Sequence, residues 1–423
     1  MIAIIGAGIA GIQAACQLRQ AGVAFCVLEA GPALGGLART GLHQQWKYDY
    51  GVKALYSRDS AVMDYLRALP VEYVEHERQA AVHHVSAGSP GGIDITYPFE
   101  NGIGELPLAD KVACVLGYLE ASTAQQPFAN FREWIVNRLG RGIAEQFMLP
   151  YNQKSWDCPL DEISLGLVAN KIHPAPLEEI IRIALGEKIT GRQYQAHFIY
   201  PREGLNALTA AMAAPVRDQI QTGFRVAAIQ AQSEGYEIVS TDGARVACQA
   251  IISTLPLPRL GRLLAPGEWP QPDWRYNSTR FLIVGLNQAP ANDLHWQFFA
   301  DPRFPFYRLT YMHNFSDRFP PCLVAEATDR GQPLRPAEFV AALETIGVKS
   351  AWVTATWEER LAFTYPIPTL RSDAEKPGVI AAFEARHIYP LGRAGAWSYS
   401  NVDGIILQAW QQVPHILERE CRA

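Results

Sequence analysis

The sequence has few of the features that mark zinc proteins, disulfide-bonded domains or membrane spans. Its seven cysteines are scattered over 423 residues, and none stands in a C-x-x-C pair or beside histidines at zinc-ligand spacing. We therefore predict no metal site, and the unpaired thiols favour a reducing, cytoplasmic compartment. No stretch reaches the roughly 18 consecutive apolar residues that a membrane-spanning helix needs, so no membrane span is predicted.

An excess of charge of one sign is also missing. The 37 Lys and Arg residues stand against 42 Asp and Glu residues, which gives a formal net charge of −5. Because nucleic acids and anionic membranes attract strongly basic surfaces, we expect neither as a partner and predict a small-molecule substrate instead. With 48% hydrophobic residues the chain is long enough for two or three packed cores, while its oligomeric state stays open.

A glycine motif near the start of the sequence carries the first functional indication. Residues 1–5 and 23–28 have the pattern of short buried strands, and a helical pattern lies between them. Gly6, Gly8 and Gly11 stand at the start of that helix in G-x-G-x-x-G spacing. Such glycines allow a tight turn, a close approach of backbone to a pyrophosphate, and close packing of the helix on the sheet. The helix N–H groups then face the phosphates.

Glu29 supports the same interpretation. It ends the second strand, 18 residues after Gly11. A carboxylate at that distance accepts hydrogen bonds from a ribose diol and repels a 2′-phosphate. The sequence therefore predicts a dinucleotide with an unphosphorylated adenosine ribose.

The segment that follows Glu29 bears on the choice of dinucleotide. Residues 29–40 contain a turn, the paired glycines Gly35 and Gly36, and Arg39. This order resembles that of the flavoprotein group that includes amine oxidases and protoporphyrinogen oxidase, and the resemblance implies FAD rather than NAD. It also implies that the glycines let the backbone pass beside the pyrophosphate, and that Arg39 neutralises the pyrophosphate or borders the flavin ring.

Later segments indicate a discontinuous architecture. Residues 131–147 have the pattern of an amphipathic helix, and residues 257–375 are rich in strand formers and aromatic side chains. We predict an α/β fold with a G-x-G-x-x-G, Rossmann-like FAD-binding domain (1–75, 196–256 and 376–423), a helical cap (76–195) and a mixed-sheet substrate region (257–375). An apolar helix from Gly404 follows Asn401 and Asp403, and its first N–H groups are expected to hold flavin carbonyls and the ribityl chain.

Several segments together resemble the UDP-galactopyranose mutases and protoporphyrinogen oxidase-like flavoproteins, thinly but over nearly the whole chain. They are Tyr48-Asp49-Tyr50-Gly51, residues 131–156, Tyr200-Pro201-Arg202-Glu203-Gly204 and residues 392–403. The resemblance implies that Trp156 stacks on uracil, that Tyr365 contacts a phosphate and that Arg393 lies beside the flavin.

The chain departs from the mutase pattern where the diphosphate is bound. Asn277 replaces one family arginine, and residues 170–174 lack the other. Arg275, Arg280 and Arg308 are possible substitutes from nearby positions. A nucleotide-sugar substrate is therefore open to question, because an arginine on a phosphate contributes strongly to binding.

A second departure places Lys53 where the mutases have a histidine, in Gly51-Val52-Lys53. A lysine at the flavin edge would favour an anionic reduced ring or an anionic substrate, or would act as a base if burial lowered its pKa. The alternative is that its side chain points to solvent.

Our expectation from the sequence is an FAD-dependent oxidoreductase that oxidises a small organic substrate by hydride transfer to flavin N5. The first alternative is a redox-neutral UDP-sugar mutase that uses reduced FAD, and the second is a non-catalytic flavin-binding partner subunit. The candidate catalytic residues are Lys53, Tyr365 and Arg393, and the candidate substrate-binding residues are Trp156, Asn277, Tyr307 and Arg308. The residues expected to bind the cofactor are Gly6, Gly8, Ala10, Gly11, Glu29, Ala30, Gly36, Leu37, Ala38, Arg39, Gly51, Val226, Gly392, Arg393, Asn401, Val402 and Asp403.

Overall fold

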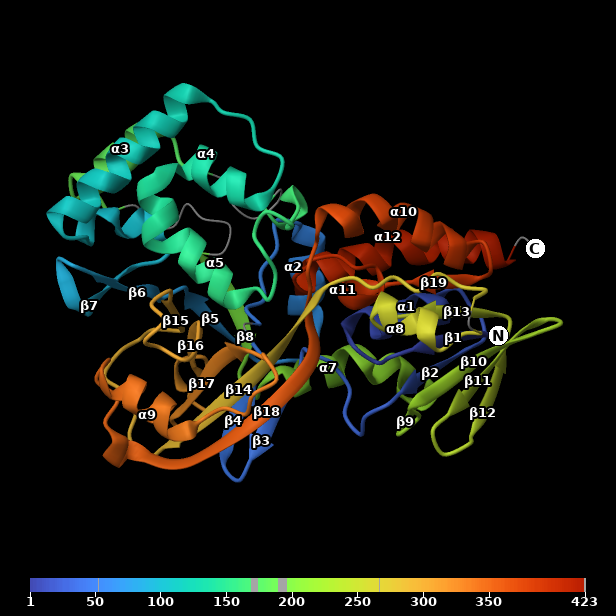
Figure 1. Ribbon diagram of the computed structural model, residues 1–423. Helices are drawn as coiled ribbons and strands as arrows, with labels where there is room; N and C mark the ends of the chain where they lie inside the picture. The colour runs from blue at the N-terminus through green and yellow to red at the C-terminus, as the bar shows by residue number, and fades with distance from the viewer. Residues whose placement is uncertain (52, 169–173, 189–195, 266, 422–423) are drawn as a thin grey trace.

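The computed structural model describes residues 1–51, 53–168, 174–188, 196–265 and 267–421. Figure 1 shows two lobes, with both chain ends in one of them and the helical cap above a curved sheet in the other. The long strands β14 (Tyr276–Leu286) and β18 (Val353–Pro366) pair with each other and run from the sheet lobe toward the lobe that holds the chain ends.

A parallel sheet of five strands forms the centre of the first lobe, in the order β19-β13-β1-β2-β9. Alternate residues of β1 belong to different hydrophobic cores, with Ile2 and Ile4 in one and Ala3 and Ile5 in the other. Both faces are covered, which explains why β1 is an unbroken apolar run. The strands are β1 (Ile2–Ile5), β2 (Phe25–Glu29), β9 (Ile220–Thr222), β13 (Ala250–Ser253) and β19 (Ile388–Pro390).

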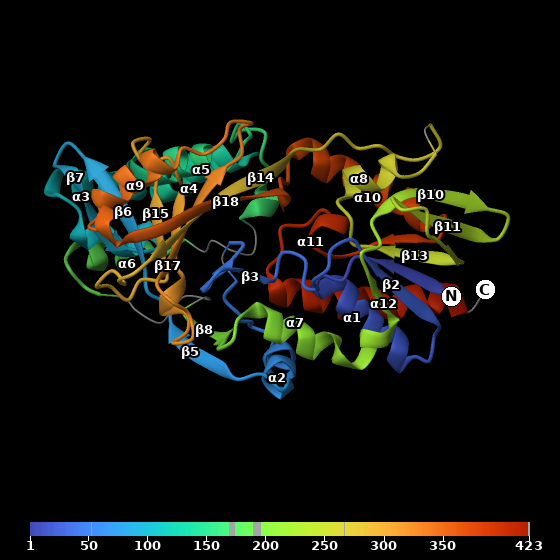
Figure 2. The same ribbon diagram turned by 90° about the horizontal axis from the view of Figure 1, so that it is seen from below.

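Different elements cover the two faces of this sheet (Figure 2). Helices α1 (Ile9–Gln20), α7 (Leu205–Ala213) and α12 (Val402–Cys421) lie on one face. The other face carries α8 (Leu257–Arg262) and a three-stranded sheet of β10 (Val226–Gln232), β11 (Gly235–Ser240) and β12 (Arg245–Cys248). The first and last helices of the chain therefore pack together, although hundreds of residues separate them in sequence.

The second lobe contains a seven-stranded mixed sheet in the order β18-β14-β17-β16-β15-β6-β7. Its last two strands come from residues that we expected in the helical cap. Strand β6 pairs in parallel with β15 and continues the sheet into β7, so residues 80–96 are part of the substrate sheet. The remaining strands are β6 (Ala80–Ser86), β7 (Ser89–Thr96), β15 (Trp296–Phe299), β16 (Arg308–Tyr311) and β17 (Cys322–Thr328).

The helical cap follows these two strands. Glycines allow helices α3 (Leu108–Ala124) and α4 (Phe131–Ile143) to cross in close contact. A Cβ on Gly140 of α4 would lie only 2.1 Å from the carbonyl oxygen of Gly117 in α3. The helix predicted over 131–147 is interrupted by a kink at Gly140, which has φ +79°, and ends as a π-helical turn. The remaining elements are η1 (Phe99–Glu105), the π turn η2 (Ala144–Met148), α5 (Leu149–Ser155), η3 (Leu165–Leu167) and α6 (Leu177–Ala184).

Shorter elements complete the chain. They are β3 (Thr40–His43), β4 (Trp46–Asp49), α2 (Ser60–Ala68), β5 (Tyr73–Glu77), β8 (His197–Pro201), η4 (Ala214–Gln219), η5 (Met312–Asn314), α9 (Pro336–Glu344), η6 (Ser350–Trp352), α10 (Leu370–Glu384) and α11 (Gly392–Gly395). Of the helices within the described ranges, none combines the length and apolar character that crossing a bilayer requires. The predicted fold class, a Rossmann-like domain with a parallel sheet beside a mixed substrate sheet, is confirmed.

Candidate functional site

One cavity of about 1120 Å³ extends from the glycine turn of the first lobe to the cap of the second. We call its part beside Gly6, Glu29 and Arg39 the nucleotide end, and its part beside Phe99, Glu100 and Phe147 the cap end. Tyr365 and Arg308 line the wall as well. The cavity thus connects residues from distant parts of the chain.

Backbone of two turns forms the nucleotide end. Gly6 has φ +100°, and a Cβ on Gly11 would lie 1.9 Å from the carbonyl oxygen of Gly6, so α1 starts in direct contact with the turn. A Cβ on Gly36 would lie 3.3 Å from the Cα of Gly8. Side chains at Gly11 and Gly36 would push these backbone segments apart, so the glycines allow the close packing that the motif predicted.

Glu29 is held in place by backbone donors. Its Oε2 accepts a hydrogen bond from the N–H of Ala7 at 2.8 Å, and its Oε1 accepts one from the N–H of Gly31 at 2.8 Å. Each carboxylate oxygen keeps a free lone pair for a hydroxyl donor. This geometry suits the predicted contact with a ribose diol.

The C-terminal block closes the opposite wall. A Cβ on Gly392, which has φ +81°, would lie 2.6 Å from the Cβ of Ala10, so the block touches the first turn of α1. Asn401 donates from Nδ2 to the hydroxyl of Tyr56 at 2.7 Å, and both residues line the cavity. The buried Nε of Arg393 has no hydrogen-bond partner among the described residues, so it is available to a bound group.

Most of the predicted cofactor residues line the cavity, and five do not. Val226 differs most from the prediction, because its side chain packs in the core between the parallel sheet and β10–β12. Gly11 has the helix-packing role that its place in the motif predicted, and Asp403 is buried in α12. The five residues outside the lining are Gly11, Ala30, Gly51, Val226 and Asp403.

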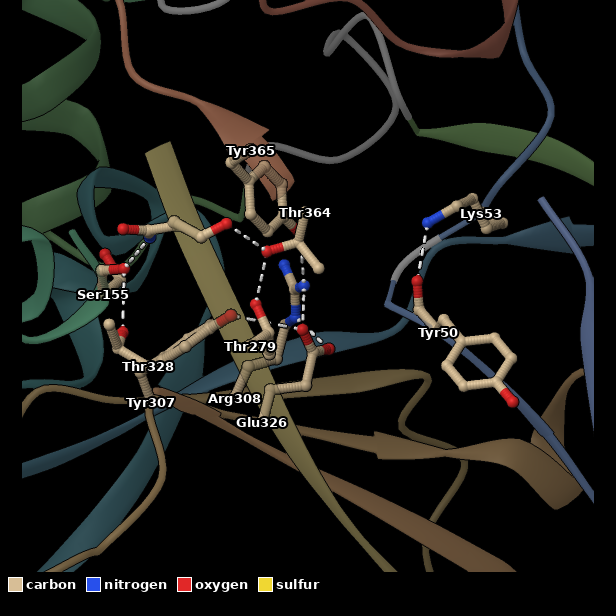
Figure 3. A network of polar contacts seen from close by, with 11 residues as sticks. Tyr50, Lys53, Ser155, Thr279, Tyr307, Arg308, Glu326, Thr328, Thr364 and Tyr365 are labelled. Atoms are coloured by element: carbon tan, nitrogen blue, oxygen red, sulfur yellow. Dashed lines mark hydrogen bonds and ion pairs between the residues drawn. The ribbon is translucent and has the colours of Figure 1, made fainter. Parts of the chain in front are cut away.

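The mixed sheet contributes a buried ion pair, shown in Figure 3. Arg308 of β16 donates from Nε and Nη2 to the two carboxylate oxygens of Glu326, at 2.7 and 2.6 Å. Glu326 stands directly opposite it on β17 and is fully buried. Arg308 also donates from Nη2 to the hydroxyl oxygen of Tyr365, at 3.1 Å. Our sequence analysis missed Glu326, although a single acid in the apolar run Cys322–Thr328 was a usable signal.

Lys53 faces the cavity and not bulk solvent. Its Nζ donates to the carbonyl oxygen of Tyr50 at 2.8 Å (Figure 3). Burial, reinforced by the charge of Arg393, lowers the pKa of Lys53 to about 8. A Cβ on Gly51 would lie 3.5 Å from both Lys53 Nζ and the Tyr365 hydroxyl, so these two groups approach the same glycine.

Three aromatic rings and a guanidinium form one wall near this cluster. The Arg393 Cζ lies 4.5 Å from the ring centroid of Tyr365 and 5.0 Å from that of Tyr399. Trp156 meets both tyrosine rings edge to face, with centroid distances of 5.8 and 5.7 Å. Tyr399 was not among the predicted site residues, although it stands inside the C-terminal block that the sequence singled out. Burial raises its pKa to about 12, so the phenol stays protonated at neutral pH.

Asn277 has a different role from the substrate contact that we expected. Its Oδ1 accepts from the N–H of Asp157 at 3.0 Å, and its Nδ2 donates to the carbonyl oxygen of Ser155 at 2.6 Å. The side-chain amide therefore fixes the backbone on both sides of Trp156. Asn277 still borders the cavity, but these two bonds engage both ends of its amide.

The proposed substitutes for the mutase arginines are mostly engaged elsewhere. Arg280 pairs with Asp329 at 2.7 Å and with Glu358, and Arg275 lies 3.2 Å from Glu162. Neither lines the cavity, whereas Arg308 does. Residues 170–173, where the second arginine is absent, lie outside the described residues.

Family models and solved structures match this fold. The model for an NAD(P)-binding Rossmann-like domain matches residues 4–69, and that for a flavin-containing amine oxidoreductase matches residues 131–298. A crystal structure of reduced UDP-galactopyranose mutase is 26% identical, with a TM-score of 0.89, and the match covers 99% of this chain and 95% of that one.

More distant structures share the fold. A protein from Exiguobacterium sp. 255-15, assigned provisionally as protoporphyrinogen oxidase, is 17% identical with a TM-score of 0.77, covering 99% of this chain and 98% of that one. Putrescine oxidase bound to putrescine is 16% identical with a TM-score of 0.70, and 99% of each chain is covered. Together with the glycine turn, the parallel sheet and the shared cavity, these matches place the chain in the FAD-dependent amine oxidase superfamily, with a structure similar to UDP-galactopyranose mutase.

Proposed function

We propose that the chain is an FAD-dependent enzyme that rearranges a sugar substrate without net oxidation, as the mutase reaction does. The observation that carries this proposal is the similarity to UDP-galactopyranose mutase over 99% of the chain, combined with the Arg308, Tyr365 and Arg393 cluster in one cavity. This reverses the order of our sequence-based expectations, in which oxidation of a small organic substrate came first.

The nucleotide end suits FAD. Glu29 would hold the adenosine ribose, the turns of Gly8 and Gly36 would lie along the pyrophosphate, and Arg393 would border the flavin ring. When bound, the flavin supplies a nucleophile at N5 in its reduced form or a hydride acceptor in its oxidised form. Lys53, with a pKa of about 8, is mostly charged at neutral pH and would stabilise negative charge on the reduced ring or the substrate.

Tyr365 is set up to donate a proton or hydrogen bond to the substrate. Its hydroxyl oxygen accepts from Arg308 at 3.1 Å, so its own O–H points elsewhere. The bidentate Glu326 keeps Arg308 in this orientation and cancels its charge. The pair thus positions Tyr365 and adds little net charge to the site.

A second candidate function is oxidation of a small organic substrate by hydride transfer to the flavin. The specific observation in its favour is that two residues are engaged with protein groups: Asn277, which replaces a diphosphate-binding arginine by resemblance, and Arg308, its possible substitute. A substrate without a diphosphate would not need them.

One pair of assays separates the candidates. For the mutase, we expect interconversion of nucleotide sugars, measured by chromatography, only after dithionite reduction and without consumption of further reductant. Anaerobic bleaching of oxidised flavin by an organic substrate would instead establish the oxidoreductase. Protein that stays colourless with added FAD would contradict both, and flavin binding without either reaction would favour a non-catalytic subunit.

A further inference from the structure

Asp49 is a buried carboxylate at the end of β4 to which the proposed function gives no role. It is 4% exposed, and its two oxygens accept from different hydroxyl groups. Thr40 donates from Oγ1 to Oδ1 at 2.6 Å, and Tyr200 donates to Oδ2 at 2.7 Å. Both donors are neutral, and within the described ranges no arginine or lysine forms an ion pair with Asp49. A charge buried in this way is costly, and such groups are frequent at functional sites.

The same hydrogen bonds join Asp49 to other segments of the chain. Thr40 lies opposite Asp49 on β3, and its Oγ1 also accepts from the N–H of Leu205, the first residue of α7, at 2.8 Å. Tyr200 belongs to β8. The N-terminal end of a helix therefore acts on the carboxylate through one hydroxyl, which favours the charged form. These bonds also fix the end of β4, directly before Tyr50.

Lys53 is bonded to this fixed segment. Its Nζ donates to the carbonyl oxygen of Tyr50, the residue that follows Asp49, at 2.8 Å (Figure 3). Asp49 and Lys53 also act on each other's charge, and each favours the ionised form of the other. Arg39 lies beside the same segment, with its Cζ 4.9 Å from the ring centroid of Tyr50, and adds positive charge there.

The other charges around Lys53 make Asp49 decisive for its protonation. Arg393 and Arg308 both oppose a positive charge on Lys53, and burial does the same. Two carboxylates favour that charge, but one of them, Glu326, gives both of its oxygens to Arg308, at 2.7 and 2.6 Å. Of the two, Asp49 is therefore the carboxylate whose charge remains to balance that of Lys53.

We propose that Asp49 is a positioning residue: its carboxylate holds the backbone segment that Lys53 binds and keeps the Lys53 side chain protonated, so that Lys53 acts as a fixed cation in the cavity and not as a base. A fixed cation suits an anionic reduced flavin or an anionic part of the substrate. This inference rests on the proposed function only in taking the cavity as the site of cofactor and substrate. It decides between the roles that the sequence left open for Lys53.

Titration of Lys53 by ¹³C NMR tests the proposal on the FAD-loaded protein. With ¹³C-labelled lysine, the Cε signal of Lys53 is identified as the one that Lys53→Arg lacks. Asp49→Asn removes the charge, while its Oδ1 still accepts from Thr40 and its Nδ2 donates to the Tyr200 hydroxyl. We expect the pKa of Lys53 to fall by about one unit from about 8, so that its deprotonated fraction at pH 7 rises about fivefold.

Two control variants separate the charge of Asp49 from its contacts. Asp64→Asn removes the same charge from an exposed position of α2 and should leave the titration of Lys53 unchanged. Tyr200→Phe removes one hydrogen bond but keeps the carboxylate, so the pKa of Lys53 should stay close to that of the wild type. A fall in Tyr200→Phe as large as that in Asp49→Asn would overturn the proposal, because the charge would then not be the cause.

The wild type supplies a second measurement that needs no variant. Burial raises the pKa of Asp49 to about 6, so the Lys53 Cε signal should show a second, smaller step near pH 6 as this carboxylate takes up a proton. An unchanged titration in folded Asp49→Asn would overturn the proposal. If that variant does not fold, the absence of the step from the wild type would overturn it. Sugar turnover does not enter these titrations, so failure of the proposed function is distinguishable from failure of this inference.

Discussion

At the scale of single residues, the site depends on charges held away from water. Glu326 is fully buried and its two oxygens are both used by Arg308. Lys53 is partly buried and is surrounded by Arg393 and Arg308 as well as by Asp49 and Glu326. Burying a charged group without a partner costs free energy of unfolding, so substitutions of Glu326 and of Lys53 should each change stability in a specific way.

Removing Glu326 should be severely destabilising. In Glu326→Ala the Arg308 guanidinium would remain buried without its partner, and we expect a loss of about 3–5 kcal/mol, measured by chemical unfolding. The double variant Glu326→Leu with Arg308→Met should recover most of this loss. Disrupting the exposed pair of Arg182 and Glu178 serves as the control and should have little effect. A small effect of Glu326→Ala would mean that water reaches the pair.

Lys53 should destabilise the protein in a pH-dependent way. Its pKa falls from 10.5 to about 8 on folding, so between these values the unfolded chain binds more protons and stability rises with pH. Lys53→Met should therefore be more stable than the wild type below pH 8, by up to about 3 kcal/mol, and this advantage should disappear as the pH approaches 10.5.

Unfolding of both proteins at a series of pH values measures this difference. Asp49, whose pKa burial raises to about 6, titrates below the window in question. The control Lys53→Arg keeps its charge throughout, so its stability relative to Lys53→Met should not vary with pH. A constant difference between Lys53→Met and the wild type would show that the lysine is solvated.

At the scale of elements, close packing between the cap helices positions the aromatic ring of Phe147. The cap helices α3 and α4 touch through Gly117 and Gly140, and the π turn follows directly after α4. Gly140 has φ +79°, which disfavours any side chain even without the contact. This crossing therefore fixes where Phe147 enters the cavity.

Gly140→Ala should destabilise the cap. The added Cβ would lie 2.1 Å from the Gly117 carbonyl oxygen, and overpacking plus backbone strain should cost about 2–4 kcal/mol. Thermal unfolding measures this effect. Gly186→Ala is the control, because Gly186 also has a positive φ of +103° but a Cβ there meets nothing within 4 Å. Equal losses in the two variants would mean that the helix contact contributes nothing.

At the scale of the whole molecule, the two ends of the chain build one wall of the cavity. Gly392 precedes α12 and contacts Ala10 at the start of α1. The glycine turn alone therefore does not complete the nucleotide end. Cofactor binding should depend on this long-range contact.

Gly392→Ala should weaken FAD binding by about tenfold or more, because the new Cβ would lie 2.6 Å from that of Ala10 and would separate the two segments. Titration of FAD fluorescence measures the affinity. Gly404→Ala is the matched control in the same region, since its Cβ would be 3.5 Å from that of Ser400, an ordinary contact. Similar affinity in Gly392→Ala and the wild type would argue against this closure.

The sequence by itself determined the fold class and the glycine turn of the nucleotide end, because Gly6, Gly8, Gly11 and Glu29 act through short-range backbone geometry that their spacing specifies. The tertiary structure alone decided which polar groups are available for substrate. The register of β16 on β17 pairs Arg308 with Glu326, the approach of β14 to α5 engages Asn277, and the packing of β10 buries Val226 in a core. Such pairings depend on strand register and on the packing of one element against another, and no local pattern encodes them.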